Sequence, residues 1–260
     1  MHISGKTGLV LSGGGARGIA HIGVLQALDE LDIHPAVISG SSAGAIAAAY
    51  YASGLSPREM MDIISDTGFL RLFRPSLLGA GFINADRIYE THKKHLKARF
   101  EELAIPAYIC ATNINEGKSV YFNSGDLPQA VNASMSMPVI FKPIEIDGYQ
   151  YLDGGIMNNF PVEPLLEHED CDFIIGVDVN AIPYKEDVSS KLNLMERVFF
   201  MSINSHADAR KEAVDVLISP KDIERFGFFD VNNAKSMYQL GYEATMEALG
   251  QRSEVKGLDV

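Results

Sequence analysis

The stretch GSSAG at residues 40–44 is a G-x-S-x-G pattern that places Ser42 between a predicted strand and a predicted helix. Glycines on both sides permit the sharp turn that exposes a serine hydroxyl, and the amino terminus of the following helix stabilises negative charge beside it. Ser42 is therefore a candidate nucleophile. By itself the pattern describes a tight structural turn equally well, so other features must decide between the two.

A glycine-rich loop precedes this serine in LVLSGGGARG, residues 9–18, where Gly13, Gly15 and Gly18 have the spacing of a dinucleotide-binding loop. Such a site needs an acidic residue at the end of the second strand, roughly 20 residues after the glycines. Residues 38–42 read ISGSS and contain no carboxylate. We therefore interpret the loop as an oxyanion hole and not as a pyrophosphate site.

Both turns follow short apolar strands and lead into helices. The strand at 7–11 continues through the glycines into a predicted helix at 17–31, and the strand at 36–39 continues through GSSAG into an alanine-rich helix that ends near Gly54. Turns of consecutive units of this kind meet at the carboxyl edge of a parallel sheet. The N–H groups of the glycine loop can then face the Ser42 hydroxyl and stabilise the oxygen of a tetrahedral acyl intermediate.

A nucleophilic serine needs a base, which is histidine in most hydrolases. His168 lies in the charged segment LEHEDCD and His206 in a predicted long helix, and we interpret both as solvated or structural. His21 is expected to pack or to hydrogen-bond in the helix after the glycine loop. His92 and His95 are expected on a solvated helix face, since they have no evident carboxylate or cysteine partner for a metal.

A carboxylate offers an alternative base in YLDGGIMNNFP, residues 151–161. Asp153 ends a predicted strand and enters a glycine turn. Taken alone, this is an ordinary Asx turn.

Three motifs in this order give the chain a resemblance to the patatin-like phospholipase family, as a bacterial-type, single-domain member. The resemblance covers roughly residues 8–178. The motifs and the segments that support them are GGGARG at 13–18, GSSAG at 40–44, DGG at 153–155, HIGVL at 21–25 and NASMSMPVIFKP at 132–143.

The resemblance implies a serine–aspartate dyad without a catalytic histidine. Ser42 would be the nucleophile and Asp153 its base, with the backbone N–H groups of Gly13, Gly14 and Gly15 as the oxyanion hole. Arg17 matches the basic position of the family's loop. Because a cation in the first turn of a helix opposes the helix dipole, Arg17 is expected either to have a partner or to contact substrate.

Family members hydrolyse acyl esters of phospholipids and other lipids without a metal ion or cofactor. The implied fold is a three-layer α/β/α sandwich with a mostly parallel central sheet, related to the catalytic domain of cytosolic phospholipase A2. Further strands are predicted at 106–112, 119–122, 144–152 around an Asp147-Gly148 turn, 173–179 and 214–218, and further helices at 56–66 and from 84 or 86 to about 98.

Composition limits the location and the partners. With 34 Asp and Glu against 22 Lys and Arg, the net charge of −12 argues against nucleic acid and against strong attachment to anionic lipid. Cys110 and Cys171 lie far apart in apolar contexts typical of reduced thiols. We expect one domain over residues 1–260 and a cytoplasmic protein. The resemblance to the family adds a lipid ester substrate and transient contact with a membrane surface.

The segment at residues 69–83, FLRLFRPSLLGAGFI, combines large apolar side chains with two arginines. Helices packed over the core are the ordinary interpretation. The functional alternative is a mobile cover that presents apolar surface to acyl chains.

We therefore predict a carboxylic ester hydrolase of the phospholipase A, lysophospholipase or esterase type. One alternative is an acyltransferase on the same scaffold, which product analysis with competing acceptors would identify. Another is a catalytically silent lipid-binding or regulatory protein, against which intact Ser42 and Asp153 argue. Labelling of Ser42 by a fluorophosphonate separates that protein from an enzyme. A dinucleotide-dependent enzyme is a distant third alternative, which titration with the cofactor would test.

Overall fold

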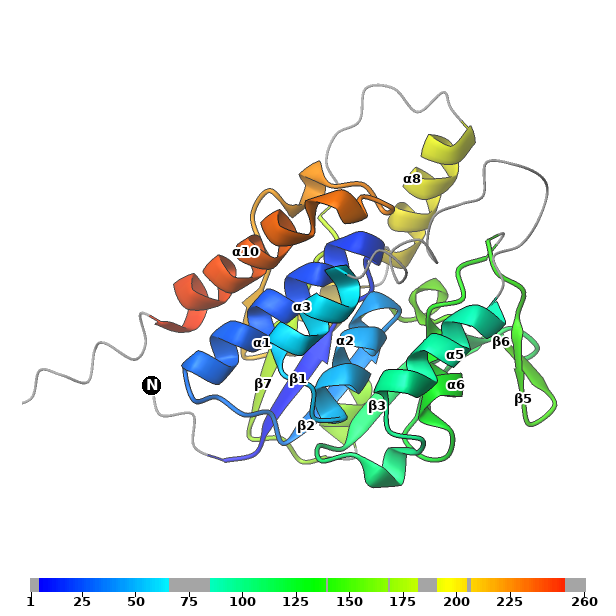
Figure 1. Ribbon diagram of the computed structural model, residues 1–260, viewed down its shortest axis with the longest axis horizontal. Coiled ribbons are helices and arrows are strands. Elements are labelled where there is room, and N and C mark those ends of the chain that lie inside the picture. The colour runs from blue at the N-terminus through cyan, green and yellow to red at the C-terminus, as the bar shows by residue number, and fades with distance from the viewer. Residues whose placement is uncertain are drawn as a thin grey trace, which may run out of the picture.

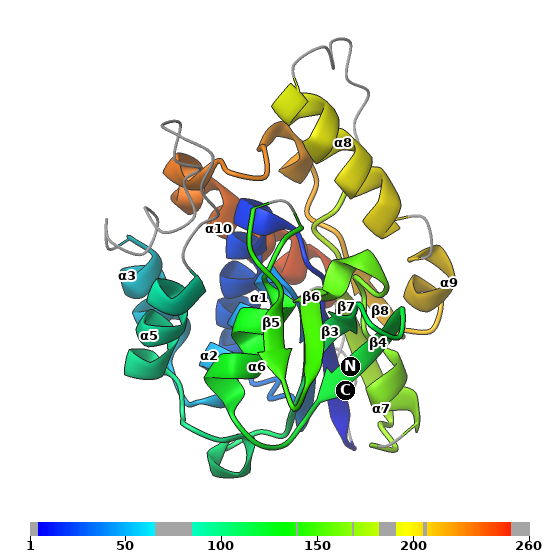
Figure 2. The ribbon, with the colours of Figure 1, turned by 90° about the vertical axis from the view of Figure 1, so that its right-hand side faces the viewer.

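The computed structural model describes residues 5–65, 85–138, 140–167, 169–181, 191–204 and 207–250. These residues form a three-layer α/β/α sandwich around a sheet of mostly parallel strands (Figures 1 and 2). The strands are β1 Thr7–Leu11, β2 Val37–Ser41, β3 Ala107–Asn113, β4 Lys118–Phe122, β5 Ile144–Ile146, β6 Tyr149–Asp153, β7 Phe173–Val177 and β8 Val216–Ile218.

Helices flank the sheet on both faces (Figure 2). They are α1 Ala20–Glu30, α2 Ala43–Ala52, α3 Pro57–Ser65, α5 Ala85–His95, α6 Leu127–Ser134, α7 Glu163–Glu167, α8 Lys191–Asn204, α9 Asp208–Lys211 and α10 Ala234–Thr245. Shorter turns of 3-10 helix include η1 Gly15–Ile19 and η3 Gly154–Ile156.

The strands lie in the order β5-β6-β3-β2-β1-β7-β8, with β1 between β2 and β7 in the interior of the sheet and β4 also pairing with β3. Neighbours from β3 to β8 in this order are parallel, whereas β4 and β6 run antiparallel to β3. Side chains of a strand alternate between the faces, so Leu9 and Leu11 pack with α1 and α2 while Val10 packs with Leu165 of α7. Burial of β1 on both faces explains its uninterrupted apolar sequence.

The register across β3 brings the two sequence motifs together. Ser41 of β2 is level with Cys110 of β3, and Asp153 of β6 is level with the next residue, Ala111. The end of β2 and the end of β6 therefore lie on either side of the same point of β3. Ser42 and Asp153 meet there although 111 positions separate them in the chain.

Local sequence signals are confirmed at several turns. Ser56 and Glu59 exchange hydrogen bonds in a capping box that begins α3. Asp147 and Gly148 have φ of 50° and 81° in the predicted turn between β5 and β6. Both signals act within a few residues, which is why the sequence alone reveals them.

The structure differs from the sequence prediction in the helices. The helix expected from Arg17 starts as η1, and α1 begins only at Ala20. After β4 the chain enters helix α6, which the sequence analysis did not predict. The long helix expected around His206 is divided into α8 and α9; His206, His168 and all of residues 69–83 lie outside the described residues.

The close packing of α1 on α10 generates a stability prediction. A Cβ at Gly23 of α1 would overlap the Tyr238 carbonyl of α10. Gly23→Ala is therefore expected to lower the free energy of unfolding by about 1–3 kcal/mol, the usual cost of overpacking. Urea denaturation measures it, with Gln26→Ala on the partly exposed face of α1 as the control. Equal stability of the two variants would show that α10 does not pack here.

Candidate active site

Ser42 lies at a strained turn between β2 and α2. Its φ of 52° and ψ of −119° are unusual for a residue with a side chain. Its backbone N–H donates to Ser134 Oγ at 2.9 Å, and Ser134 Oγ donates to the Cys110 carbonyl at 2.6 Å. The turn is thus fixed by a hydroxyl from α6, and the strain holds the Ser42 side chain at the carboxyl edge of the sheet.

Asp153 accepts the hydroxyl proton of Ser42, with 2.7 Å between Ser42 Oγ and Asp153 Oδ2. Its other carboxylate oxygen accepts from the Gly155 N–H at 2.8 Å. The backbone of Asp153 is held by the Ser136 carbonyl and by the Thr112 hydroxyl. Hydrogen bonds on both sides leave the carboxylate one orientation.

Burial governs the protonation of this pair. Asp153 is 1% exposed, and loss of hydration raises its pKa from 3.8 to about 6, against the lowering effect of hydrogen bonds from Ser42 and Gly155. The carboxylate is still ionised at neutral pH. A base with a pKa of about 6 is better matched to a serine hydroxyl than an ordinary aspartate.

The glycine loop lies beside Ser42, because a Cβ at Gly13 would be 3.0 Å from Ser42 Cβ. The Gly13 N–H donates to the Asn159 carbonyl at 3.2 Å and is therefore engaged inside the protein. This differs from the expectation for Gly13. Within the described part of the chain, the N–H groups of Gly14 and Gly15 meet no acceptor.

Arg17 is buried, and its guanidinium donates to carbonyls of the protein. The acceptors are the backbone oxygens of Phe226 at 2.7 Å, Ala181 at 3.0 Å and Glu224 at 3.4 Å. The sequence left open whether Arg17 has a partner within the protein or contacts substrate, and in the structure it has partners within the protein. Arg17 ties the glycine loop to the chain segment that precedes α10.

The described histidines have other partners than Ser42. His21 is buried and Nε2 lies 2.8 Å from the Ser12 carbonyl, as expected of a hydrogen-bonding residue; burial lowers its pKa to about 4. His92 is also buried, with Nδ1 3.2 Å from Tyr50 Oη, so the solvated face expected for it is wrong. His95 is exposed. The apolar side of α5 faces α2, which the HKKH spacing does not reveal.

An apolar cavity of about 110 Å³ opens at Ser42. It extends along α2 past Ile46 and Ala47 to Tyr50, two helical turns from the serine. Its other walls are Ile19, Ile22, Met60, Ile63, Ile64, Met135, Met137, Ile140, Phe141, Phe228, Phe229 and Val231. A wall with so few polar groups accommodates hydrocarbon and not a charged or sugar group.

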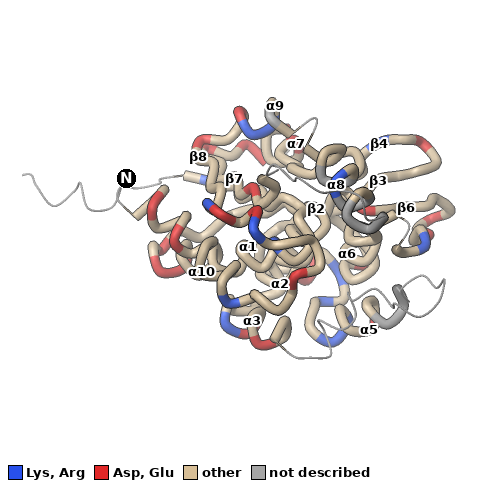
Figure 3. The backbone as a smooth tube through the Cα atoms, turned by 90° about the horizontal axis from the view of Figure 1, so that it is seen from above, with Lys and Arg blue, Asp and Glu red and all other residues tan. Residues whose placement is uncertain are grey.

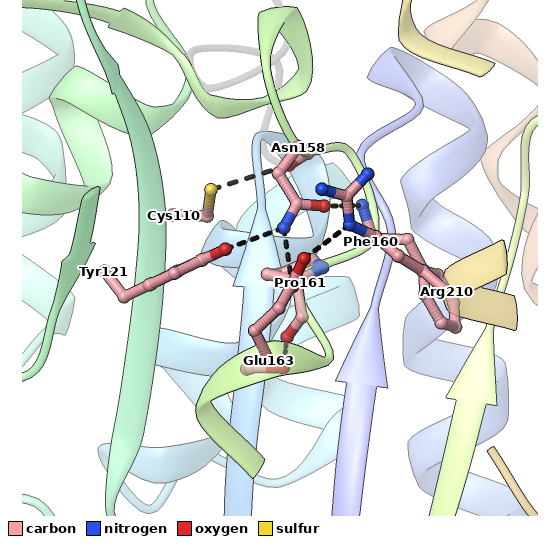
Figure 4. Close-up of polar contacts among 8 residues, drawn as sticks. Cys110, Tyr121, Asn158, Phe160, Pro161, Glu163 and Arg210 are labelled. Atoms are coloured by element: carbon pink, nitrogen blue, oxygen red, sulfur yellow. Dashed lines mark hydrogen bonds and ion pairs between the residues drawn. The ribbon is translucent and has the colours of Figure 1, made fainter. Parts of the chain in front are cut away.

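A buried polar network supports the loop after Asp153 (Figure 4). Asn158 Nδ2 donates to Tyr121 Oη at 2.9 Å and to Glu163 Oε2 at 2.7 Å, and Asn158 Oδ1 accepts from the Phe160 N–H at 3.1 Å. Arg210 of α9 pairs with Glu163. The network fixes the chain between Asp153 and α7, and with it the Asn159 carbonyl that holds Gly13.

The described residues also bear on charge distribution, metal binding and membrane spanning. Lys and Arg are interspersed with Asp and Glu in the view from above (Figure 3). Among the residues with described positions, no group of three His, Cys, Asp or Glu side chains could hold a metal ion. None of the described helices is long and apolar enough to cross a membrane.

A family model described as patatin-like phospholipase matches residues 9–166, which include every residue of the pair and the loop. The chain belongs to the patatin-like phospholipase family. An uncharacterized NTE family protein of Mycobacterium bovis is 36% identical over 180 residues, covering 68% of this patatin-like chain and 50% of that protein. The chain thus spans about half the length of these curated relatives.

Two other similarities extend over more of the chain. Lysophospholipase nte1 of Emericella nidulans is 27% identical over 280 residues, covering 93% of this chain and 18% of that protein. The crystal structure of VipD from Legionella pneumophila has a TM-score of 0.61 at 17% identity, covering 95% of this chain and 67% of VipD. The likeness to VipD confirms the fold of the patatin-like chain.

Sequence reasoning missed two residues whose hydrogen bonds fix the backbone at Ser42 and in the glycine loop. Ser134 lies within the NASMSMP segment, but its bond to the Ser42 N–H depends on the placement of α6. Asn180 lies beyond β7, where its amide contacts the glycine loop. One signal could have pointed to Asn180. Two polar residues, Asp178 and Asn180, directly follow the buried strand β7, which lies beside β1.

The raised pKa of Asp153 predicts a pH-dependent cost to stability. Below pH 3.8 the carboxyl is protonated in the folded and unfolded chain; as pH rises to about 6 the unfolded chain ionises first, so stability falls by about 3 kcal/mol in total. Asp153→Asn has no carboxyl to ionise at this position, so its stability does not fall in this way as pH rises. Urea unfolding should show the variant gaining on the wild type mainly between about pH 4 and about pH 6, with a constant difference at higher pH. A difference that is constant over the whole range would mean that Asp153 is not buried as an ion.

Proposed function

We propose that this protein is a serine lipid-acyl hydrolase that cleaves carboxylic esters of lipids through Ser42 and Asp153. The observation that carries the proposal is the 2.7 Å hydrogen bond between Ser42 Oγ and a buried Asp153, at the mouth of an apolar cavity. The name of the relative from Emericella nidulans, a lysophospholipase, agrees with this class of substrate.

Acylation begins when Ser42 Oγ attacks the ester carbonyl and Asp153 takes the hydroxyl proton. The carbonyl oxygen becomes an oxyanion, which the N–H groups of Gly14 and Gly15 stabilise. Collapse of the tetrahedral intermediate breaks the bond to the alcohol, which receives the proton from Asp153. The acyl group then remains as an ester of Ser42.

Deacylation repeats these steps with water. Asp153 removes a proton from the attacking water, and the proton returns to Ser42 Oγ when the fatty acid leaves. Every proton transfer uses one carboxylate, so the site needs neither a histidine nor a metal ion. An alcohol in place of water would give acyl transfer, and the released product distinguishes the two outcomes.

The acyl chain is the part of the substrate that the cavity recognises. The walls between Ser42 and Tyr50 are aliphatic, aromatic or methionine side chains. Burial of each methylene there contributes about 0.8 kcal/mol. If the cavity binds the acyl chain, the alcohol portion of the lipid stays outside it. Transient contact of the protein with a membrane surface would deliver the lipid to the cavity.

The dyad is tested by single replacements assayed on a soluble short-chain ester. Ser42→Ala is expected to fold and to lose all turnover, because the nucleophile is absent. Asp153→Asn keeps the shape but cannot accept the proton, so kcat should fall roughly 10²-fold to 10⁴-fold. His168→Gln and His206→Gln should retain most activity, and circular dichroism confirms the fold of each variant.

Two results would contradict the dyad. An inactive His168→Gln or His206→Gln protein beside an active Asp153→Asn protein would indicate a conventional triad. Loss of turnover in EDTA, with recovery on adding calcium, would show that a metal ion takes part.

The cavity predicts a change of chain-length preference in Ala47→Leu. The added atoms occupy the channel beside Ser42, so kcat/KM for a long-chain ester should fall at least about 10-fold, the usual worth of one misplaced methylene. The butyrate ester serves as the internal control and should be hydrolysed as before. Ile46→Ala should shift the preference toward longer chains. Parallel losses on both esters would place the acyl chain elsewhere.

A further inference from the structure

Asn180 is a buried asparagine whose side chain hydrogen-bonds to the glycine loop. It is 2% exposed and lies just beyond β7, next to β1 in the sheet. Its Nδ2 lies 2.6 Å from the Gly13 carbonyl, 3.0 Å from Ser12 Oγ and 3.0 Å from Asp178 Oδ1. Neither acylation nor deacylation as described above uses this residue.

The surrounding oxygens fix which way the amide points. A flipped amide would place Oδ1 against the Gly13 carbonyl and the Asp178 carboxylate, both of which are acceptors only. Asp178 is itself fixed, because Oδ1 accepts from the Asn180 N–H at 3.0 Å and Oδ2 pairs with Lys211 at 2.7 Å. The Asn180 donor is therefore held toward the Gly13 carbonyl.

The bond to the Gly13 carbonyl determines the direction of the Gly14 N–H. The two groups belong to one trans peptide, in which C=O and N–H point in opposite directions. Donation from Asn180 on one side leaves the Gly14 N–H aimed away from it. The preceding peptide is held as well, by His21 at the Ser12 carbonyl and by the Asn159 carbonyl at the Gly13 N–H.

Three consecutive glycines have more backbone freedom than any other sequence, whereas an oxyanion hole is effective only when its donors are oriented before the reaction. We propose that Asn180 is a positioning residue that presets the Gly14 N–H as an oxyanion donor. The inference rests on the proposed function and adds a requirement that the dyad alone does not have. Asn180 acts through Gly14 and does not touch substrate.

The experiment compares Asn180→Ala and Asn180→Asp with the wild type on a short-chain ester. Both remove the donor, and the aspartate keeps the shape of the side chain. With kcat normalised to the fraction of protein that a fluorophosphonate titrates, kcat should fall roughly 10-fold to 100-fold, somewhat less than loss of a whole donor. KM and the acid limb of the pH profile should stay unchanged, because Asp153 is untouched.

Asn113→Ala is the matched control. Asn113 is equally buried, and it hydrogen-bonds the turn between β3 and β4 and not the glycine loop. It should leave the normalised kcat unchanged. Wild-type kcat in either Asn180 variant, an equal loss in Asn113→Ala, or a loss confined to KM would overturn the inference.

The failure of this inference differs from failure of the dyad. If Ser42→Ala retains turnover, the proposed function is wrong. If Ser42→Ala is inactive while the Asn180 variants keep the wild-type normalised kcat, the dyad stands and the glycine loop is oriented without Asn180.

Discussion

The hydrogen bond between Ser42 and Asp153 forms across β3, which lies between the strands that carry the two residues. Neither strand can shift by a residue without separating the pair, since a slip also exchanges the faces of the sheet. Most polar contacts near the site serve this constraint. Ser134 ties Ser42 to Cys110 of β3, and Thr112 of β3 holds the Asp153 carbonyl.

Desolvation makes the direct pair chemically useful. In water a carboxylate with its ordinary pKa is a weak base, but burial raises the pKa of Asp153 to about 6 while the Ser42 and Gly155 donors keep it ionised at neutral pH. The cavity along α2, which opens at Ser42, is lined almost wholly by apolar side chains. In the proposed mechanism, proton transfer and acyl binding share this apolar surrounding, and the cost of burying Asp153 is lower stability at neutral pH.

Much of the strand pattern and the exposed turn at Ser42 could be predicted, because their signals are local. The pairing of Asp153 with Ser42 was expected only from the resemblance to the family, since the sequence around Asp153 by itself describes an Asx turn. The apolar run of β1, the Asp147-Gly148 turn and the capping box of α3 are each set within a few residues. Contacts made after folding could not be predicted in this way. Asn159 takes the Gly13 N–H and Tyr50 meets His92 only because distant elements pack together. The resemblance placed Gly13 in the oxyanion hole, and the absence of an evident partner in the sequence placed His92 in solvent.

The central claim is that Asp153 activates Ser42 directly. The rate at which a fluorophosphonate modifies Ser42, followed by intact mass and peptide mapping across pH, tests it without dependence on a lipid. The account predicts one acid limb with a midpoint of about 6, set by the pKa of Asp153, and its disappearance together with most of the rate in Asp153→Asn. A limb that persists in Asp153→Asn, or modification at another residue, would contradict it.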